Sequence, residues 1–585
     1  AALVVCWSIH FWPHLHTANE SIRLYFTQAL VENGSPILDP ICARHGAIPV
    51  DRSEFDGHIL MDKAPGLSLL AAPLYAVLRV VWPPIGRQDF WLLGYLATMF
   101  CVLLPLCAGL WQLRRWILAH GAAESTAGLT LLCLLLASPL MIYGGLFFGH
   151  GLAAGLIAIA FFGLASADDD APSVARSAVA GGAAGYAGLV DTPVFLLAAM
   201  LCLYAIFRRR GSLLRQVVSA LPFIAGVAAA AVAQLGYNAW VLGDPFKFTY
   251  QFKGDAALAA IHAEGLMGFG VPSAEALWGL WWGSARGLFY HAPWLLVAAW
   301  GLLSTARSGN GTSERARRDA RWLLAIVAGY ALIVAGFVDW KAGDAAGARH
   351  LVPIVALLGA GLPLALPIAD RVVHPRLRSA LRAGFAALVS AGVLMHLPTV
   401  AGFPYHFDRI EYPVFELAWP VVTIFSAHSP SLGGLLGLPG PVSFMLQSAV
   451  LGLAFALWSR AAIADGGLAH DDAPGIGRSR AFGLYVTFML LWLSAMVAPI
   501  TRPGRAVQAA KYQAISLLGQ GLSTRARLGD DPEGSLERKL PARTPKLTIR
   551  EKMARRAERR ALRARARAEA SGVPQPLPAA ATATR

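Results

Sequence analysis

The residues best suited to chemistry stand directly after the apolar opening run AALVVCWSIHFW. The stretch HTANESIRLYFTQALVENGSPILDP follows at 16–40 and brings Asn19, Glu20 and Arg23 close together in the sequence. A carboxylate there can accept a proton from a hydroxyl group, and a neighbouring cation can bind an anion. The alternative is an ordinary interfacial ion pair between Glu20 and Arg23.

A second polar group follows in DRSEFDGHILMDKAPG at 51–66, which carries Asp56, His58, Asp62 and Lys63. The ammonium of Lys63 is a compact point charge of the kind that binds phosphate. The alternative is a lysine whose stem lies along an apolar helix with its charge in water.

Further polar residues stand at the ends of later apolar runs. GARH at 347–350 brings Arg349 and His350 to the start of one run, where free helix N–H groups favour an anion. His150 and Asp191 occupy tight turns between runs, and Arg286 lies in the loop GSARG. Each of these single residues is alternatively a structural polar group.

The sequence pattern does not support a metal site. Asp56, His58, His150 and His350 are candidate ligands, but no closely spaced pair such as HxxxH joins them. The six cysteines form no CxxC pattern, and only Cys42 lies in a polar loop. A divalent metal is therefore unsupported, and no cofactor is assigned.

The elements that must position these residues are membrane helices. The chain has 585 residues, of which 56% are hydrophobic and only 15% charged, which is typical of an all-α polytopic membrane protein. With the opening run, which we interpret as the outer end of a first helix, we expect about thirteen transmembrane helices. The other runs lie at about 90–113, 125–145, 149–166, 176–190, 193–207, 217–240, 291–306, 322–339, 350–368, 383–398, 441–459 and 481–499.

Basic clusters predict which loops face inward. They lie at 112–116, 207–215, 306–321 and 371–382, and the positive-inside bias places them in the cytoplasm. The candidate residues then fall in outward loops, above all 13–89, 243–290 and 340–349. The segment 67–82 is interpreted as an interfacial helix on the outer leaflet.

The C-terminal region differs from the rest of the chain. Residues 501–585 hold 19 Lys and Arg against 7 Asp and Glu, which supplies +12 of the net charge of +15. We therefore divide the chain into a transmembrane domain at 1–500, with its first outer loop at 14–89, and a basic Arg- and Ala-rich tail at 501–585. The tail is expected to be partly helical or disordered, and its charge suits anionic lipid or a protein or nucleic-acid partner.

Several motifs, taken in order, resemble the GT-C superfamily of membrane glycosyltransferases, which includes protein O-mannosyltransferases and lipid A aminoarabinose transferases. They are ANESIRLY (18–25), DGHILMDKAPGLSLLAAPLYAV (56–77), LFFGHGLAAGL (146–156), GLVDTPVFLL (188–197), GSARGLFYHAPWLL (283–296) and AGDAAGARHLVPIVALLGAGL (342–362). The resemblance covers residues 1 to about 460 and identifies the chain with an uncharacterised bacterial branch. Many members have Asp, or an Asp-Glu pair, where this chain has Asn19-Glu20.

The resemblance implies a polyprenyl-phosphate sugar as donor and a catalytic carboxylate in the first outer loop. Glu20 would act on the acceptor, and Lys63, Arg349 and His350 would bind the donor phosphate. The expected location is the bacterial inner membrane, as a multi-pass protein among membrane lipids. Two alternatives remain: a transporter or flippase for a lipid-linked glycan, and a catalytically silent scaffold or subunit.

Overall fold

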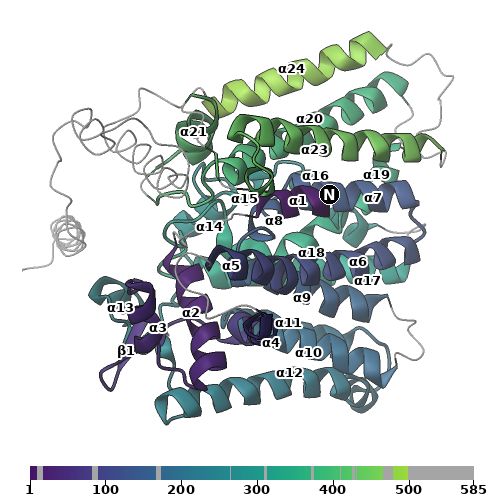
Figure 1. Ribbon diagram of the computed structural model, residues 1–585. Coiled ribbons are helices and arrows are strands. Elements are labelled where there is room, and N and C mark those ends of the chain that lie inside the picture. Colours follow the sequence, from purple (N-terminus) through teal and green to yellow (C-terminus); the bar gives the residue numbers. More distant parts are fainter. Residues whose placement is uncertain are drawn as a thin grey trace, which may run out of the picture.

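The structure is a computed structural model that describes residues 1–9, 17–81, 90–166, 173–263, 265, 267–308, 313–370, 374–408, 410–424, 428–429, 431–464 and 478–497. Figure 1 shows the long helices running side by side, with α2, α3, β1 and α13 gathered at one end of them. The predicted tail at 501–585 lies outside the described residues.

The segments before and between the long helices form short elements. They are α2 (Ala18–Asn33), α3 (Asp39–His45), β1 (Arg52–Phe55), β2 (His58–Met61), α4 (Gly66–Val81), η2 (Thr249–Phe252), α13 (Ala256–Ala263), α14 (Ala274–Trp281) and α15 (Leu288–His291).

The remaining elements build the bundle. They are α1 (Ala2–Ser8), α5 (Phe90–Thr98), η1 (Met99–Leu103), α6 (Leu104–Ala119), α7 (Glu124–Leu136), α8 (Leu140–Tyr143), α9 (Gly149–Ala165), α10 (Val174–Val190), α11 (Val194–Phe207), α12 (Leu213–Leu242), α16 (Leu295–Arg307), α17 (Glu314–Ala335), η3 (Arg349–Ile354), α18 (Val355–Gly359), α19 (Leu362–Asp370), α20 (Pro375–Ala401), η4 (Val414–Ala418), α21 (Trp419–Thr423), α22 (Leu432–Leu435), α23 (Gly440–Ala464) and α24 (Arg478–Val497).

Helix α2 begins and ends on clear local signals. Thr17 is the N-cap, and its Oγ1 accepts a hydrogen bond from the backbone N–H of Glu20 at 3.3 Å. Gly34 ends the helix with a φ of +58°, a left-handed conformation that glycine adopts without strain. The first outer loop therefore opens with a defined helix that fixes the direction of every side chain between 18 and 33.

The segment 14–89, predicted to be the first outer loop, also contains a β-hairpin, which the all-helical prediction missed. β1 and β2 pair antiparallel, with Phe55 opposite His58, and Asp56 and Gly57 form the turn with φ values of +50° and +78°. Asp-Gly is the usual sequence of such two-residue turns. The hairpin positions Asp62 and Lys63 directly after its second strand.

The bundle core depends on small residues that let helix backbones approach closely. A Cβ built on Gly155 of α9 would lie 2.6 Å from Leu106 Cα of α6. A Cβ on Gly181 of α10 would lie 2.0 Å from the carbonyl oxygen of Phe223 in α12. Small residues at helix contacts are typical of membrane bundles, where packing must replace the hydrophobic effect.

The helices agree with a multi-pass membrane protein, but the predicted count of about thirteen spans is not confirmed. Within the described ranges, four helices are long and apolar enough to cross a membrane, or five if the bent pair Arg349–Gly359 and Leu362–Ile368 is one span. Several predicted runs form shorter helices. The run at 125–145, for example, is divided at Ser138 and Pro139 between α7 and α8.

Helix α4 corresponds to the segment predicted to lie along the outer interface. It is seen nearly end-on in Figure 1, whereas the long helices run across the view. Leu67, Ala71 and Tyr75 are fully buried, but Val80 and Val81 at its end are largely exposed. One side of this helix therefore packs on the protein while apolar residues remain on the other.

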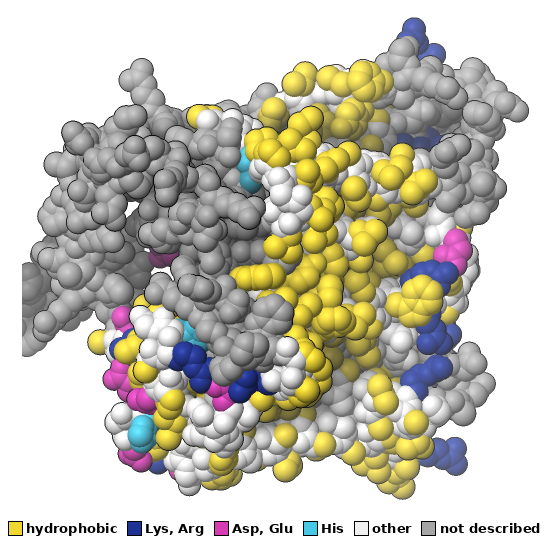
Figure 2. All heavy atoms as spheres, in the orientation of Figure 1, with side chains coloured by type: hydrophobic (Ala, Val, Ile, Leu, Met, Phe, Trp, Pro, Cys, Tyr) yellow, Lys and Arg dark blue, Asp and Glu magenta, His cyan; other side chains and the backbone are white. Residues whose placement is uncertain are grey.

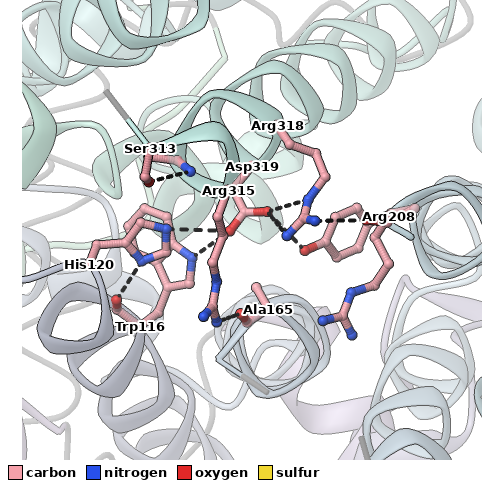
Figure 3. A network of polar contacts seen from close by, with 10 residues as sticks. Trp116, His120, Ala165, Arg208, Ser313, Arg315, Arg318 and Asp319 are labelled. Atoms are coloured by element: carbon pink, nitrogen blue, oxygen red, sulfur yellow. Dashed lines mark hydrogen bonds and ion pairs between the residues drawn. The ribbon is translucent and has the colours of Figure 1, made fainter. Parts of the chain in front are cut away.

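The ends of α6, α11 and α17 that carry the predicted inward basic clusters meet at the buried carboxylate of Asp319. Trp116 Nε1 donates to Asp319 Oδ2 at 3.1 Å, and His120 Nε2 lies 3.5 Å from the same oxygen. Figure 3 shows these side chains and Arg318 converging on Asp319. Three of the predicted basic clusters, 112–116, 207–215 and 306–321, therefore gather at one end of the bundle.

The surface also differs between the two ends. Figure 2 shows apolar side chains over the middle of this face, Lys and Arg at the right-hand helix ends, and mixed acidic, basic and His side chains at the lower left. A cationic end opposite a mixed polar end is the distribution that the positive-inside bias describes. The mixed end carries the candidate functional residues.

Candidate functional site

Glu20 is buried and held by three hydrogen bonds. Its Oε1 accepts from the backbone N–H of Phe147 at 3.0 Å. Its Oε2 accepts from the hydroxyls of Thr17 at 2.9 Å and Tyr405 at 2.6 Å. Burial raises the pKa of Glu20, and these hydrogen bonds only partly offset that effect. The carboxylate is thus both firmly placed and more basic than an exposed one.

Arg23 connects Glu20's helix to the segment that carries Lys63. Its Nε donates to Asn19 Oδ1 at 3.1 Å and its Nη1 to the carbonyl of Ala64 at 3.2 Å. These two bonds replace the interfacial Glu20–Arg23 ion pair that the sequence left open. Ala64, the residue after Lys63, is therefore hydrogen-bonded to α2 through Arg23.

Lys63 belongs to a compact group of two lysines and two carboxylates, which we call the Lys/Asp quartet. Its Nζ lies 3.1 Å from Asp51 Oδ2 and 3.4 Å from Asp62 Oδ2. Lys253 Nζ pairs with Asp62 Oδ2 as well. All four side chains are mostly or fully buried. The quartet is therefore two buried pairs of opposite charges rather than a surface salt bridge.

Within the quartet, Lys63 and Asp51 hold each other in the charged form. Burial alone would lower the pKa of Lys63, but Asp51 and Asp62 outweigh burial and raise it above its usual value. Burial alone would raise the pKa of Asp51, but Lys63 and then Lys253 hold it below its usual value. Lys63 and Asp51 are therefore both ionised near neutral pH, whereas burial and then the charge of Lys63 lower the pKa of Lys253.

Lys253 was missed by the sequence analysis, because nothing in TYQFKGD marks one lysine of a long outer loop. The hairpin brings it to the site. Ser53 of β1 forms an isolated antiparallel β-bridge with Lys253, and its Oγ donates to the carbonyl of Thr249 at 2.6 Å. The backbone N–H of Gly254 donates to Arg52 at 3.1 Å. The segment 249–254 thus packs beside β1 and delivers Lys253 to Asp62.

Arg349 lies close to the quartet and forms no ion pair with a described carboxylate, although its charge acts on the pKa of Asp339. Its charge acts on the pKa of both Lys63 and Asp51, and its guanidinium carbon lies 5.7 Å from the ring centroid of Phe148. Its Nε is buried and forms no hydrogen bond with any residue that the structure describes. A buried guanidinium nitrogen without an acceptor is a position at which an anionic ligand gains a strong hydrogen bond.

His150, Asp191 and His350 lie together beside Arg349. His150 Nδ1 is 2.9 Å from Asp191 Oδ2, and the rings of His150 and His350 meet edge to face with centroids 5.7 Å apart. Burial alone would raise the pKa of Asp191, but its interaction with His150, followed by those with His350 and Arg23, holds it below its usual value. Two residues predicted separately at different turns therefore form one pair.

The guanidinium of Arg286 is bonded to backbone carbonyls and so is not free to bind a ligand. Its guanidinium donates to the backbone carbonyls of Lys341, Gly343 and Ala345, and the side chain is buried. These bonds shape the loop that leads directly into Arg349. We therefore place Arg286 behind the site, as the residue that holds this loop.

A chain of contacts links the three residues expected to act together. Tyr405 donates to Glu20 and stacks on Phe148, and Phe148 in turn lies beneath Arg349. On the other side, α2 reaches the backbone beside Lys63 through Arg23. Segments far apart in sequence therefore meet at one end of the bundle. The roles of these residues stay predictions.

Two predicted residues lie away from this cluster. Asp56 is exposed in the hairpin turn, and His58 is exposed with its Nδ1 3.7 Å from Asp39 Oδ2. Both belong to the hairpin's own structure. Across the described part of the chain, no group of three or more His, Cys, Asp or Glu is arranged to hold a metal ion.

Comparisons with known proteins add two similar structures. No family model matches the sequence, and no curated protein matches it. The chain is similar to ArnT from Cupriavidus metallidurans bound to undecaprenyl phosphate, with 17% identity, a TM-score of 0.44, and coverage of 85% of this chain and 76% of that chain. The apo form of that ArnT gives 16% identity, a TM-score of 0.40, and coverage of 85% and 75%. Because both TM-scores are below 0.5, the chemistry must be argued from the residues of this chain.

Proposed function

We propose that this chain is a membrane glycosyltransferase that takes a sugar from a polyprenyl-phosphate donor and transfers it on the outer face of the membrane. The observation that carries the proposal is the unpartnered Nε of Arg349 beside the Lys/Asp quartet. The resemblance of the sequence motifs to GT-C enzymes supports the same reaction class.

The balance of charge favours a donor with one phosphate. The quartet contributes two ammonium groups and two carboxylates, so its contacts cancel. The charge of buried Arg23 is balanced by that of Asp191, which acts on it. Arg349 then supplies one positive charge that no described carboxylate contacts. A sugar joined to a lipid through a single phosphate is a phosphodiester with one negative charge, which matches this excess. A diphosphate would bring a second negative charge that this group of residues leaves uncompensated.

The proposed reaction assigns each group a task. The acceptor hydroxyl attacks the anomeric carbon while the bond from that carbon to the phosphate oxygen breaks. Glu20 accepts the proton of the hydroxyl, and its raised pKa suits a general base. Arg349 and Lys63, with His350 beside them, stabilise the departing lipid phosphate, which already leaves well as a monoester.

The remaining parts of the proposal concern location. We place the protein in a bacterial inner membrane, with about thirteen crossings, the site on the outer side and the basic clusters inside. The exposed apolar residues of α4 would border the lipid in which the polyprenyl chain of the donor lies. The tail at 501–585 would remain outside the catalytic unit.

The test uses full-length protein in lipid nanodiscs. Undecaprenyl phosphate binding is measured by native mass spectrometry, and transfer is measured with a panel of undecaprenyl-phosphate hexoses and a cell-envelope extract as acceptor. Arg349→Gln should weaken lipid phosphate binding by roughly 10- to 100-fold, as expected for one lost charged hydrogen bond. Arg52→Gln is the matched control, because Arg52 pairs with the exposed Glu54.

The two alternative functions predict other results. A flippase would move a fluorescent lipid-linked glycan between the leaflets of proteoliposomes without consuming the donor. A silent scaffold would bind lipid phosphate with the same affinity in wild type and Arg349→Gln. Either result would remove the proposed reaction.

A further inference from the structure

The two oxygens of Glu20 are not equivalent. Oε2 accepts two O–H groups, from Thr17 at 2.9 Å and from Tyr405 at 2.6 Å. Oε1 accepts one N–H group, from the backbone of Phe147 at 3.0 Å. Because each carboxylate oxygen has two lone-pair sites, Oε1 keeps one of them available for a further proton donor.

Tyr405 is itself held in place on several sides. Its ring stacks on Phe148 with centroids 6.4 Å apart and meets Phe403 edge to face at 5.5 Å. The next residue, His406, accepts a hydrogen bond at its carbonyl from Ala345 at 2.9 Å. The hydroxyl of Tyr405 thus approaches Glu20 from a fixed loop that is joined to the loop before Arg349.

We propose that Tyr405 is a positioning residue for the reaction: its hydroxyl occupies Glu20 Oε2 and so presents Oε1 to the acceptor hydroxyl. This inference rests on the proposed function of Glu20. The polar contact of the Tyr405 hydroxyl is with Glu20, so Tyr405 would act through the carboxylate. The sequence gives no hint of it, because 385 residues separate the two partners.

The same bond sets how basic Glu20 is. A donor to the ionised carboxylate stabilises the charged form, so Tyr405 lowers the pKa of Glu20 against the larger raising effect of burial. The described groups that face the carboxylate are Tyr405 from its loop, Thr17 from the start of α2, and the N–H of Phe147 from the turn before α9. None of them is charged, so loss of one donor has a direct effect.

The experiment measures the pKa of Glu20 without relying on transfer activity. The infrared carboxyl absorption of the full-length protein in nanodiscs is followed against pH, with the spectrum of Glu20→Gln subtracted. Tyr405→Phe keeps the ring contacts and removes the hydroxyl. It should raise the pKa of Glu20 by about one to two units, as expected when a hydrogen bond to a charged group is lost.

A matched control removes a tyrosine hydroxyl from a different buried carboxylate. Tyr204→Phe deletes the contact to Asp319 at 3.3 Å, at the opposite end of the bundle, and should leave the pKa of Glu20 unchanged. If Tyr405→Phe does not fold, Tyr405→Leu also lacks the hydroxyl and should give the same shift. An unchanged pKa in the folded Tyr405 variant, or an equal shift in Tyr204→Phe, would overturn the proposal.

A second measurement connects the pKa to the reaction. With whichever donor of the hexose panel is active, the acidic limb of the pH–rate profile of Tyr405→Phe should move upward by the same one to two units. A purely structural role would lower the rate at every pH and leave the limb in place. If no donor reacts, the proposed function fails while the infrared titration still decides the role of Tyr405 toward Glu20.

Discussion

The Lys/Asp quartet makes a prediction that separates folding from ligand binding. Replacing Lys63 alone with methionine removes the closest partner of Asp51, at 3.1 Å, and leaves this largely buried carboxylate with the more distant charges of Lys253 and Arg349. Breaking a buried ion pair by removing one partner typically costs about 3–5 kcal/mol. Because 21% of the Asp51 side chain is exposed and Lys253 remains, we expect about 3 kcal/mol.

The double variant Asp51→Asn with Lys63→Met should recover most of this loss. Removing both charges leaves no unpaired ion, and replacing buried pairs by uncharged groups is often close to neutral. We therefore expect the double variant to lie within about 1 kcal/mol of wild type in the free energy of unfolding. Its affinity for undecaprenyl phosphate should nevertheless stay low, because the cation that faces the phosphate is still missing.

The assay measures the free energy of reversible unfolding in bicelles by steric trapping. Lipid phosphate affinity is measured separately in nanodiscs, and the two values are compared for each variant. Lys341→Met is the matched control, since Lys341 is half exposed and lies 3.9 Å from the exposed Glu275. It should change the free energy of unfolding by less than about 0.5 kcal/mol. If the single Lys63 variant were as stable as this control, Lys63 and Asp51 would not form the buried pair on which the reasoning depends.

The pH dependence of stability gives the same quartet a second signature. The pKa of Asp51 is lowered in the folded state, so its stabilisation is present above its unfolded pKa of about 4 and is lost as pH falls through the folded value. The pKa of Lys63 is raised, so its stabilisation is present below its unfolded pKa of about 10.4 and is lost only above the folded value. The double variant should show a flatter profile at both ends of this window.

Three further predictions follow from the structure. Glu20→Gln should slow transfer by on the order of 10²–10⁴-fold, because it removes the general base. The variant should still fold, because the amide oxygen accepts from Phe147 and the hydroxyls of Thr17 and Tyr405 accept from the amide nitrogen. Full complementation of the lost cell-envelope glycan would contradict this prediction. Arg286→Met should reduce lipid phosphate affinity and stability together, since it releases the carbonyls that shape the loop before Arg349, and equal affinity in a folded variant would argue against that role. Deletion of 505–585 should alter neither transfer nor lipid phosphate binding when both are measured in nanodiscs.

The sequence alone determined the class of the protein and predicted that its candidate polar residues share one side. Apolar runs separated by basic clusters require a membrane protein, because such runs are stable only in lipid or in a large core. The same reasoning placed Glu20, Lys63 and Arg349 in outward loops, and the structure puts them at one end of the bundle. The hairpin was readable in principle from Asp56-Gly57, a turn signal that the helical interpretation passed over.

Only the tertiary structure decided which residues meet. Lys253 reaches Asp62 across 191 positions because 249–254 packs beside β1, and Tyr405 reaches Glu20 because its loop packs on Phe148. Local patterns such as helical periodicity indicate which residues within a turn or two share a face. They do not indicate which distant segments pack together. For the same reason apolar runs gave the membrane class but not the span count, which depends on where Pro and Ser residues break a run into shorter helices.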